Sequence, residues 1–205
     1  MKKVLVACEY SGIVKDAFIK QGYDAVSCDL RKSESNLGKH YQEDILEHLN
    51  KHSQEYDLMI AHPPCTYLSN SGVRWLYEKE KRWKKMIDAG LLFRKLYNQD
   101  IPHIAIENPI MHKWGRKVIG IGKQDQSFQP YHFGEKEQKR ICLWLKNLPK
   151  LEYSKDLSKQ VKDMDRKDLQ KKYWMGSNSS KERSRFFPGV AEAMAKQWGN
   201  HISRK

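Results

Sequence analysis

Short apolar runs alternate with longer amphipathic stretches along most of this chain. The runs at residues 3–8, 24–28, 58–61 and 104–106 are bounded by glycine, proline or charged residues, which predicts buried strands. A short helix is expected at 45–49, and apolar side chains at helical spacing predict two more helices through Ile13, Ala17, Phe18, Ile19, Val190, Ala191, Met194, Ala195 and Trp198. Strands that alternate with helices predict an α/β fold with a mostly parallel sheet and helices on both faces.

The stretch at 57–72 is the most informative part of the pattern. Its apolar run ends at Pro63 and Pro64, which cannot donate hydrogen bonds to a sheet, and Cys65 follows at once. Cys65 is therefore expected in a loop just beyond the carboxyl end of a strand, the edge at which open α/β sheets bind ligands. A thiol in this position is a candidate nucleophile, and the alternative is a small buried apolar residue.

The first turn has the layout of a nucleotide site. Residues 9–12 connect the first strand to a helix, and the second strand ends at Asp29, where many related folds keep an acid for ribose hydroxyls. The three-glycine fingerprint of such turns is missing. Asp44 directly precedes the short helix expected at 45–49, where it is a candidate N-cap.

Residues 66–85 are dense in basic and aromatic side chains, which can neutralise phosphates and stack on bases. The alternative is an amphipathic helix whose Trp83, Ile87, Leu91 and Leu92 pack inward. We expect both: a core helix from residue 83 onward, and a loop at 67–82 that closes on the substrate.

Composition narrows the range of partners. The chain has 205 residues, 31% of them charged and 39% hydrophobic, which is typical of a soluble globular protein of one domain or little more. No apolar run is long enough to cross a membrane, and the four cysteines are too far apart in sequence to indicate a metal site or disulfides, so a cytoplasmic protein is expected. The net charge of +13 indicates a polyanionic partner such as nucleic acid, unless the lysines only form a solvated surface.

Several of these stretches together resemble the DNA cytosine-5 methyltransferases. Pro63-Pro64-Cys65 followed by Ser69 and Gly72 resembles the nucleophile motif, with Thr66 in place of glutamine. Glu107-Asn108-Pro109 is similar to the family's Glu-Asn-Val, and Asp44-Ile45 to its Asp-Ile pair. The turn at 8–12 resembles a glycine-poor form of the cofactor loop. Gly134, Gln138 and Arg140 resemble a later motif, with one extra residue.

The resemblance implies a Rossmann-like methyltransferase fold with S-adenosylmethionine as cofactor and DNA as partner. It implies a catalytic core at 1–145, a short basic insert at 146–188 in place of a recognition domain, and a C-terminal helix at 189–205. A monomer without bound metal is expected. Two alternatives remain: a nucleic-acid-binding protein on a decayed methyltransferase scaffold, and an enzyme that modifies free pyrimidine nucleotides.

The same resemblance assigns individual residues. The expected catalytic residues are Cys65, Glu107, Asn108 and Arg140. The expected cofactor contacts are Cys8, Glu9, Tyr10, Ser11, Gly12, Asp29, Asp44 and Pro63. The expected nucleic-acid contacts are Ser69, Arg74, Trp75, Lys79, Arg82, Gln138 and Lys139.

Overall fold

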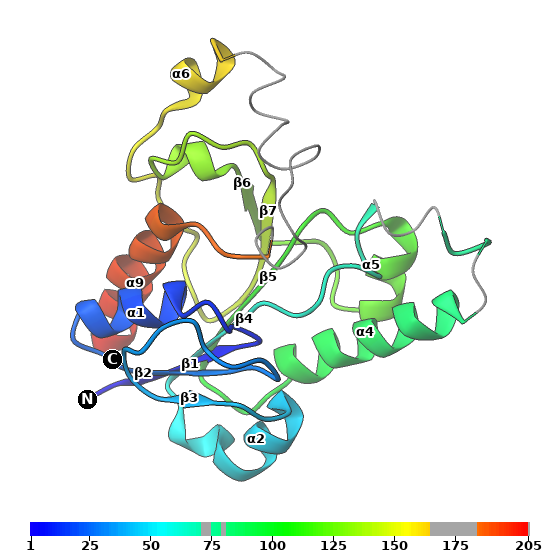
Figure 1. The fold of residues 1–205 in the computed structure, drawn as a ribbon, viewed down its shortest axis with the longest axis horizontal. Helices are drawn as coiled ribbons and strands as arrows, with labels where there is room; N and C mark the ends of the chain where they lie inside the picture. The colour runs from blue at the N-terminus through cyan, green and yellow to red at the C-terminus, as the bar shows by residue number, and fades with distance from the viewer. Residues whose placement is uncertain (71–74, 79–80, 165–183, 205) are drawn as a thin grey trace.

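A computed structural model describes residues 1–70, 75–78, 81–164 and 184–204 of the chain (Figure 1). Its centre is one sheet in the order β3-β2-β1-β4-β5-β7-β6. The strands are β1 (Lys3–Ala7), β2 (Asp24–Cys28), β3 (His40–Tyr41), β4 (Leu58–Ala61), β5 (His103–Asn108), β6 (Gln126–Phe128) and β7 (Ile141–Lys146). Neighbours from β3 to β5 pair in parallel, whereas β7 runs antiparallel to both β5 and β6. This order with one reversed strand is that of Rossmann-like methyltransferases, and it confirms the predicted fold class.

Helices cover both faces of the sheet (Figure 1). On one face lie α1 (Ile13–Lys20) and α9 (Pro188–Ser203), and on the other lie α2 (Ile45–His52), α4 (Arg82–Tyr97) and α5 (Lys113–Ile119). The shorter helices are η1 (Ser53–Glu55), η2 (Pro130–His132) and α6 (Ser158–Lys162). None of the described helices is long and apolar enough to cross a membrane.

The central strands are buried on both sides, as continuous apolar runs predict. In β1, Val4 and Val6 pack with the α1 and α9 side chains, and Leu5 and Ala7 pack with the opposite layer. Successive side chains of a strand point to opposite faces, so each strand contributes to two separate hydrophobic clusters. Trp198 of α9 is fully buried in the first cluster.

The predicted inward face of α4 is wrong for three of its four residues, because only Leu92 packs against the core. Trp83, Ile87 and Leu91 are 38%, 45% and 43% exposed, and the buried side of the helix instead carries Met86, Gly90, Phe93 and Leu96. The reason is the contact with α5. A Cβ on Gly90 would lie 2.4 Å from Cγ1 of Val118, so only the glycine side of α4 can approach α5 this closely.

Five short elements were not predicted: β3, β6, α5, η1 and η2. The strands have two and three residues, too few for an alternating pattern, and α5 lies in a stretch without a clear apolar stripe. Residues 165–183, which belong to the basic insert expected at 146–188, lie outside the described residues, as do Arg74 and Lys79.

Candidate active site

The parallel strands β1, β2, β4 and β5 end at one edge of the sheet, and the candidate residues follow these ends. The first turn comes after β1, Asp29 after β2, and Cys65 after β4. Glu107 and Asn108 are the last two residues of β5. Because β4 pairs directly with β5, with Ala61 opposite Ile106, the Cys65 loop and Glu107 come from neighbouring strands.

The loop at Cys65 has a defined backbone. Pro63 is buried and Pro64 is exposed, and the carbonyl of Cys65 accepts hydrogen bonds from the N–H groups of Leu68 and Ser69, both at 3.0 Å. Ser69 also forms an isolated bridge with Met111, which ties the loop to the chain before α5. The turn therefore holds Cys65 at the sheet edge, where its side chain is only partly exposed.

Cys65, Glu107 and Lys139 interact through charge. Burial raises the pKa of the Cys65 thiol most, the negative charge of Glu107 raises it further, and the ammonium of Lys139 opposes both. The resting cysteine is therefore a thiol, and its ionisation depends on the charge of Glu107. Lys139, expected from the sequence to contact nucleic acid, is the basic residue near Cys65, whereas Arg140 is exposed and acts on the buried Cys142.

Asn108 supports the loop from beneath. Its side chain is fully buried, and Nδ2 donates to the carbonyl oxygen of Pro63 at 3.3 Å. Oδ1 is also buried and has no hydrogen-bond partner among the described residues. In this structure Asn108 thus fixes the proline platform of Cys65.

His62 is a site residue that the sequence interpretation missed. Its Nδ1 lies 3.4 Å from Oε2 of Glu107, and only 12% and 15% of the two side chains are exposed. Nε2 is buried without a hydrogen-bond partner in the described part of the chain, and the ring of Phe186 lies 4.7 Å away. His62 directly precedes the two prolines, but its significance depends on a partner on another strand.

The first turn adopts the left-handed conformations that a glycine-rich loop would supply. Cys8 has φ 58° and Gly12 has φ 78°. The N–H groups of Cys8 and Glu9 both donate to the carbonyl of Cys28, at 2.8 and 3.3 Å. A Cβ on Gly12 would lie 2.4 Å from Cβ of Ser35, so this position requires glycine for space as well as for φ. A cysteine thus takes one left-handed position at a cost in backbone strain.

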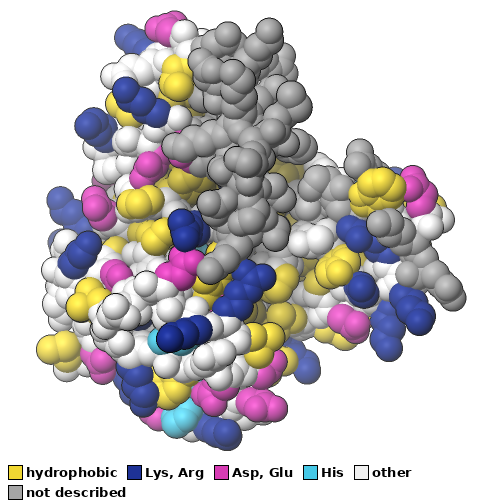
Figure 2. Space-filling view, viewed as in Figure 1, with side chains coloured by type: hydrophobic (Ala, Val, Ile, Leu, Met, Phe, Trp, Pro, Cys, Tyr) yellow, Lys and Arg dark blue, Asp and Glu magenta, His cyan; other side chains and the backbone are white. Residues whose placement is uncertain are grey.

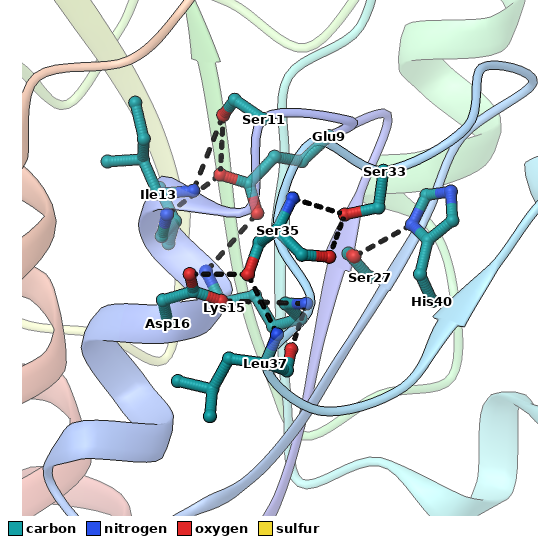
Figure 3. A network of polar contacts seen from close by, with 11 residues as sticks. Glu9, Ser11, Ile13, Lys15, Asp16, Ser27, Ser33, Ser35, Leu37 and His40 are labelled. Atoms are coloured by element: carbon teal, nitrogen blue, oxygen red, sulfur yellow. Dashed lines mark hydrogen bonds and ion pairs between the residues drawn. The ribbon is translucent and has the colours of Figure 1, made fainter.

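The side chain of Glu9 faces inward and accepts hydrogen bonds from the first turn of α1 (Figure 3). Its carboxylate accepts hydrogen bonds from the N–H groups of Val14 at 2.7 Å and Lys15 at 3.2 Å, and from the hydroxyl of Ser11 at 3.3 Å. Burial raises the pKa of Glu9, while the charge of His62 and the two backbone hydrogen bonds lower it. Glu9 therefore stabilises the turn from within, and it lies close enough to His62 to interact with it electrostatically.

A buried polar network fixes the loop after β2 against α1 (Figure 3). Ser35 donates to Oδ2 of Asp16 at 2.6 Å, and the buried ammonium of Lys15 donates to the carbonyl of Leu37. Lys15 is also 3.5 Å from Oδ1 of Asp16. The network holds the first turn and the loop at 33–37 as one unit.

The charges of Asp29 and Asp44 both act on Cys8. After burial, the negative charges of Asp29, Cys28 and Asp44 are the causes that raise the pKa of Cys8. Oδ1 of Asp29 accepts from the N–H of Arg31 at 2.9 Å, and within the described ranges Oδ2 has no hydrogen bond. Asp44 is the N-cap of α2, accepting from the N–H groups of Leu46 and Glu47, so the capping interpretation holds for its Oδ1. These carboxylates can accept hydrogen bonds from sugar hydroxyls and attract a positive charge, so they are compatible with S-adenosylmethionine.

The segment at 184–187 covers part of the same edge. Ser184 and Tyr10 share a hydrogen bond of 2.9 Å between their hydroxyls, and Arg185 pairs with Glu34 at 2.9 Å. Phe186 packs on His62, and Phe187 lies 5.7 Å below the ammonium of Lys139. The chain before α9 therefore contacts the first turn, His62 and Lys139 together.

The remaining expected nucleic-acid residues lie around this edge. Arg82 lies over the ring of Tyr67 at 4.9 Å, Trp75 is partly exposed, and Gln138 is exposed. A separate cavity of about 400 Å³ lies at the opposite edge of the sheet, where Asp57 and Ile101 precede their strands.

The chain was also compared with known proteins. No family model and no curated protein matches it. Solved structures do resemble it, and three of them each have a TM-score of 0.45. They are a putative DNA modification methyltransferase of an E. coli prophage (14% identity, 71% of this chain, 46% of that chain), the Entamoeba histolytica methyltransferase EhMeth (15%, 76%, 57%) and the S. pombe Dnmt2 methyltransferase (16%, 80%, 54%). The chain spans about half the length of these structures.

Proposed function

We propose that this protein transfers a methyl group from S-adenosylmethionine to C5 of cytosine in DNA. The observation that carries the proposal is the pairing of Cys65 with Glu107, which come from neighbouring parallel strands and lie close enough for the Glu107 charge to raise the pKa of the thiol. A thiol beside a carboxyl group is the combination that addition to a pyrimidine ring requires.

Cys65 is the nucleophile in this proposal. C5 of cytosine reacts poorly with electrophiles, so the thiolate first adds to C6 and forms the S–C6 bond. The electron pair of the C5–C6 double bond then makes C5 nucleophilic. After C5 gains the methyl group, a water molecule or hydroxide takes the C5 proton, the S–C6 bond breaks, and the thiolate leaves as the C5–C6 double bond re-forms.

Glu107 controls the charge of the ring. N3 of cytosine accepts hydrogen bonds, so a protonated Glu107 donates to N3 and stabilises the negative charge that addition at C6 would otherwise leave on the ring. A neutral Glu107 no longer opposes ionisation of Cys65. Binding of cytosine to protonated Glu107 thus favours the thiolate in the same step.

His62 and Lys139 assist from either side. Nδ1 of His62 lies next to Oε2 of Glu107, which leaves Oε1 of Glu107 free to face the base. His62 then stabilises the Glu107 carboxylate when the Glu107 proton moves to N3. His62 is a positioning residue because it acts through Glu107. Lys139 favours the Cys65 thiolate by its positive charge.

S-adenosylmethionine, when bound, supplies an electrophilic methyl group on a sulfonium. Oδ2 of Asp29 is available for a ribose hydroxyl, and the fold of the first turn supports a nucleotide beside it. Asp44 near the adenine remains a prediction. Glu9 contributes by holding the turn, since its carboxylate oxygens already accept hydrogen bonds from α1 and Ser11.

DNA is supported as the substrate by the net charge of +13. The Cys65 addition requires access above the plane of the ring, so a cytosine in a duplex must first leave the base stack.

A direct test measures transfer of labelled methyl groups from S-adenosylmethionine to DNA. Wild type should methylate cytosine at C5, and Cys65→Ala and Glu107→Gln should each lose most of the activity while still binding the cofactor. Cys142→Ala is the matched control, because it removes a thiol from β7 outside the proposed machinery. Full activity of Cys65→Ala would refute the mechanism.

A second candidate is a nucleic-acid-binding protein on a methyltransferase scaffold that has lost activity. The raised pKa of Cys65 and the non-glycine Cys8 in a left-handed turn favour it. Calorimetric titration with S-adenosylmethionine, with and without DNA, separates the two, because the second candidate requires no cofactor binding. Transfer to a free cytidine nucleotide, measured in the same assay, would identify the third possibility.

A further inference from the structure

Aromatic and basic side chains interleave on a surface beside the Cys65 loop, which we call the aromatic-basic strip. Its residues come from the loop after Cys65, the turn at 75–78, the start of α4, and α5. They are Tyr67, Tyr77, Trp83 and Trp114 with Arg82, Lys85, Lys113 and Lys117. Figure 2 shows hydrophobic and basic side chains next to one another over this part of the molecule, at the right of the view.

The rings of the strip hold one another in place. Tyr77 and Trp83 meet edge to face with centroids 5.7 Å apart, and Trp83 and Trp114 do so at 6.1 Å. Despite these contacts, Tyr77 is 77% exposed and Trp83 is 38% exposed. The rings are therefore both ordered by packing and accessible, as a stacking surface for a ligand needs to be.

The cations of the strip lie against these rings. Arg82 and Lys85 lie 4.9 and 5.7 Å from the centre of Tyr67, and Lys113 and Lys117 lie 5.3 and 5.7 Å from Trp114. Positive charge thus alternates with aromatic surface at both ends of the strip. A chain of phosphates and unpaired bases has the matching alternation of charge and flat rings.

The strip is joined to the loop that carries Cys65. The N–H of His112 donates to the carbonyl of Leu68 at 2.9 Å, and a Cβ on Gly115 would lie 2.8 Å from the same oxygen. Arg82 donates to the carbonyl of Thr66 at 3.4 Å. A ligand on the strip would therefore continue directly from a base at Cys65.

We propose that the aromatic-basic strip binds a stretch of unpaired DNA beside the target cytosine. Bases in a duplex are already stacked on each other, so exposed Tyr77 and Trp83 rings match a single strand, while the cations suit its phosphates. A second copy of this chain does not fit, because two molecules of charge +13 would repel each other through these basic faces. The proposal rests on the proposed function only for the choice of DNA as the nucleic acid.

Fluorescence anisotropy tests this proposal by comparing the affinity for three labelled ligands: a single DNA strand of about 12 nucleotides, the matching duplex, and an RNA of the same sequence. Wild type should bind the single DNA strand most tightly. Trp83→Leu should weaken that affinity about 10-fold and change duplex affinity less, since it removes stacking but no charge. The double variant Lys113→Gln/Lys117→Gln should weaken both and flatten the salt dependence. Leu91→Ala is the matched control, an exposed apolar residue on α4 outside the strip.

Circular dichroism of each variant verifies that it is folded. Equal affinity of wild type for duplex and single strand, tighter binding of RNA, or unchanged binding by folded Trp83→Leu would each overturn the proposal. Methylation is measured separately. Loss of single-strand binding in Trp83→Leu without any methyl transfer by wild type would support the strip and refute the proposed function. Methylation by wild type together with unchanged single-strand binding by Trp83→Leu would support the proposed function and refute the strip.

Discussion

Cys65 and Glu107 are more informative as a pair than either is alone. A buried thiol beside a carboxylate has a raised pKa, which by itself opposes nucleophilic attack. The same carboxyl group, when it is protonated and donates a hydrogen bond to N3 of a base, removes that opposition. In the proposed mechanism, thiol ionisation is thus linked to substrate binding, and the free protein is protected from side reactions of a permanent thiolate.

The charges around Cys65 can be tested without any catalytic assay. Glu107→Gln should lower the pKa of Cys65, because it removes a negative neighbour, and Lys139→Gln should raise it. The rate of Cys65 alkylation by iodoacetamide as a function of pH, followed by peptide mass spectrometry, reports both. Lys136→Gln, an exposed lysine nearby in sequence, serves as the control. Shifts in the opposite directions would show that the three groups are not coupled as described.

His62 should affect turnover through Glu107. His62→Leu should lower kcat about 10- to 100-fold, the range expected for losing a hydrogen bond to a charged group, with little change in KM. His62→Asn keeps a donor near the position of Nδ1 and should recover part of the loss. If His62 acts through Glu107, the pH dependence of kcat should differ between His62→Asn and wild type. An unchanged pH dependence would indicate a merely structural role and would contradict the assignment.

At the scale of elements, the strands were predictable because their apolar runs are continuous. The predicted limits of the runs at 24–28 and 58–61 coincide with β2 and β4. The buried face of α4 was not predictable, because apolar residues lie on two sides of this helix. The close approach of α5 at Gly90 buries the side that carries Gly90. His62 and the effect of Lys139 on Cys65 were missed for a related reason: each depends on residues far away in sequence.

The start of α1 depends on Glu9, and its stability should reflect this. Glu9→Ala leaves the N–H groups of Val14 and Lys15 without their acceptor and should cost about 1–2 kcal/mol in unfolding free energy. Glu47→Ala, on the exposed side of α2, is the control and should have a small effect. Guanidinium denaturation monitored by circular dichroism measures both, and equal losses would show that Glu9 is not a cap.

The contribution of Glu9 to the unfolding free energy changes with pH in a definite direction. Burial raises the folded-state pKa of Glu9, so its contribution to stability is full below its ordinary carboxyl pKa and declines as pH rises through the raised value. The stability of wild type relative to Glu9→Gln should therefore increase as the pH is lowered. The opposite trend would show that hydrogen bonds, rather than burial, dominate the titration.

At the scale of the whole molecule, the proposed function implies that positive charge and a short insert would decide how DNA is read. Between β7 and α9 the chain has little material for a separate recognition domain, and lysine–phosphate contacts carry no sequence information. We therefore predict a short or relaxed target sequence, most of whose discrimination comes from residues 153–174. Affinity for DNA should fall at least about 10-fold between low and physiological salt.

Bisulfite sequencing of DNA from cells that express the protein tests the prediction about the target. Methylated cytosines should occur in many contexts. Methylation confined to one long fixed sequence would show that the segment at 146–188 reads bases after all.

The most direct test of the account is covalent trapping of Cys65 on DNA that contains 5-fluorocytosine. Fluorine at C5 cannot leave as a proton does, so the reaction should stop with the S–C6 bond intact after methyl transfer. Wild type incubated with this DNA and S-adenosylmethionine should form an adduct that survives denaturing electrophoresis and maps to Cys65, and Cys65→Ser should form none. An adduct in Cys65→Ser, or its absence in wild type that binds both DNA and cofactor, would contradict the proposed mechanism.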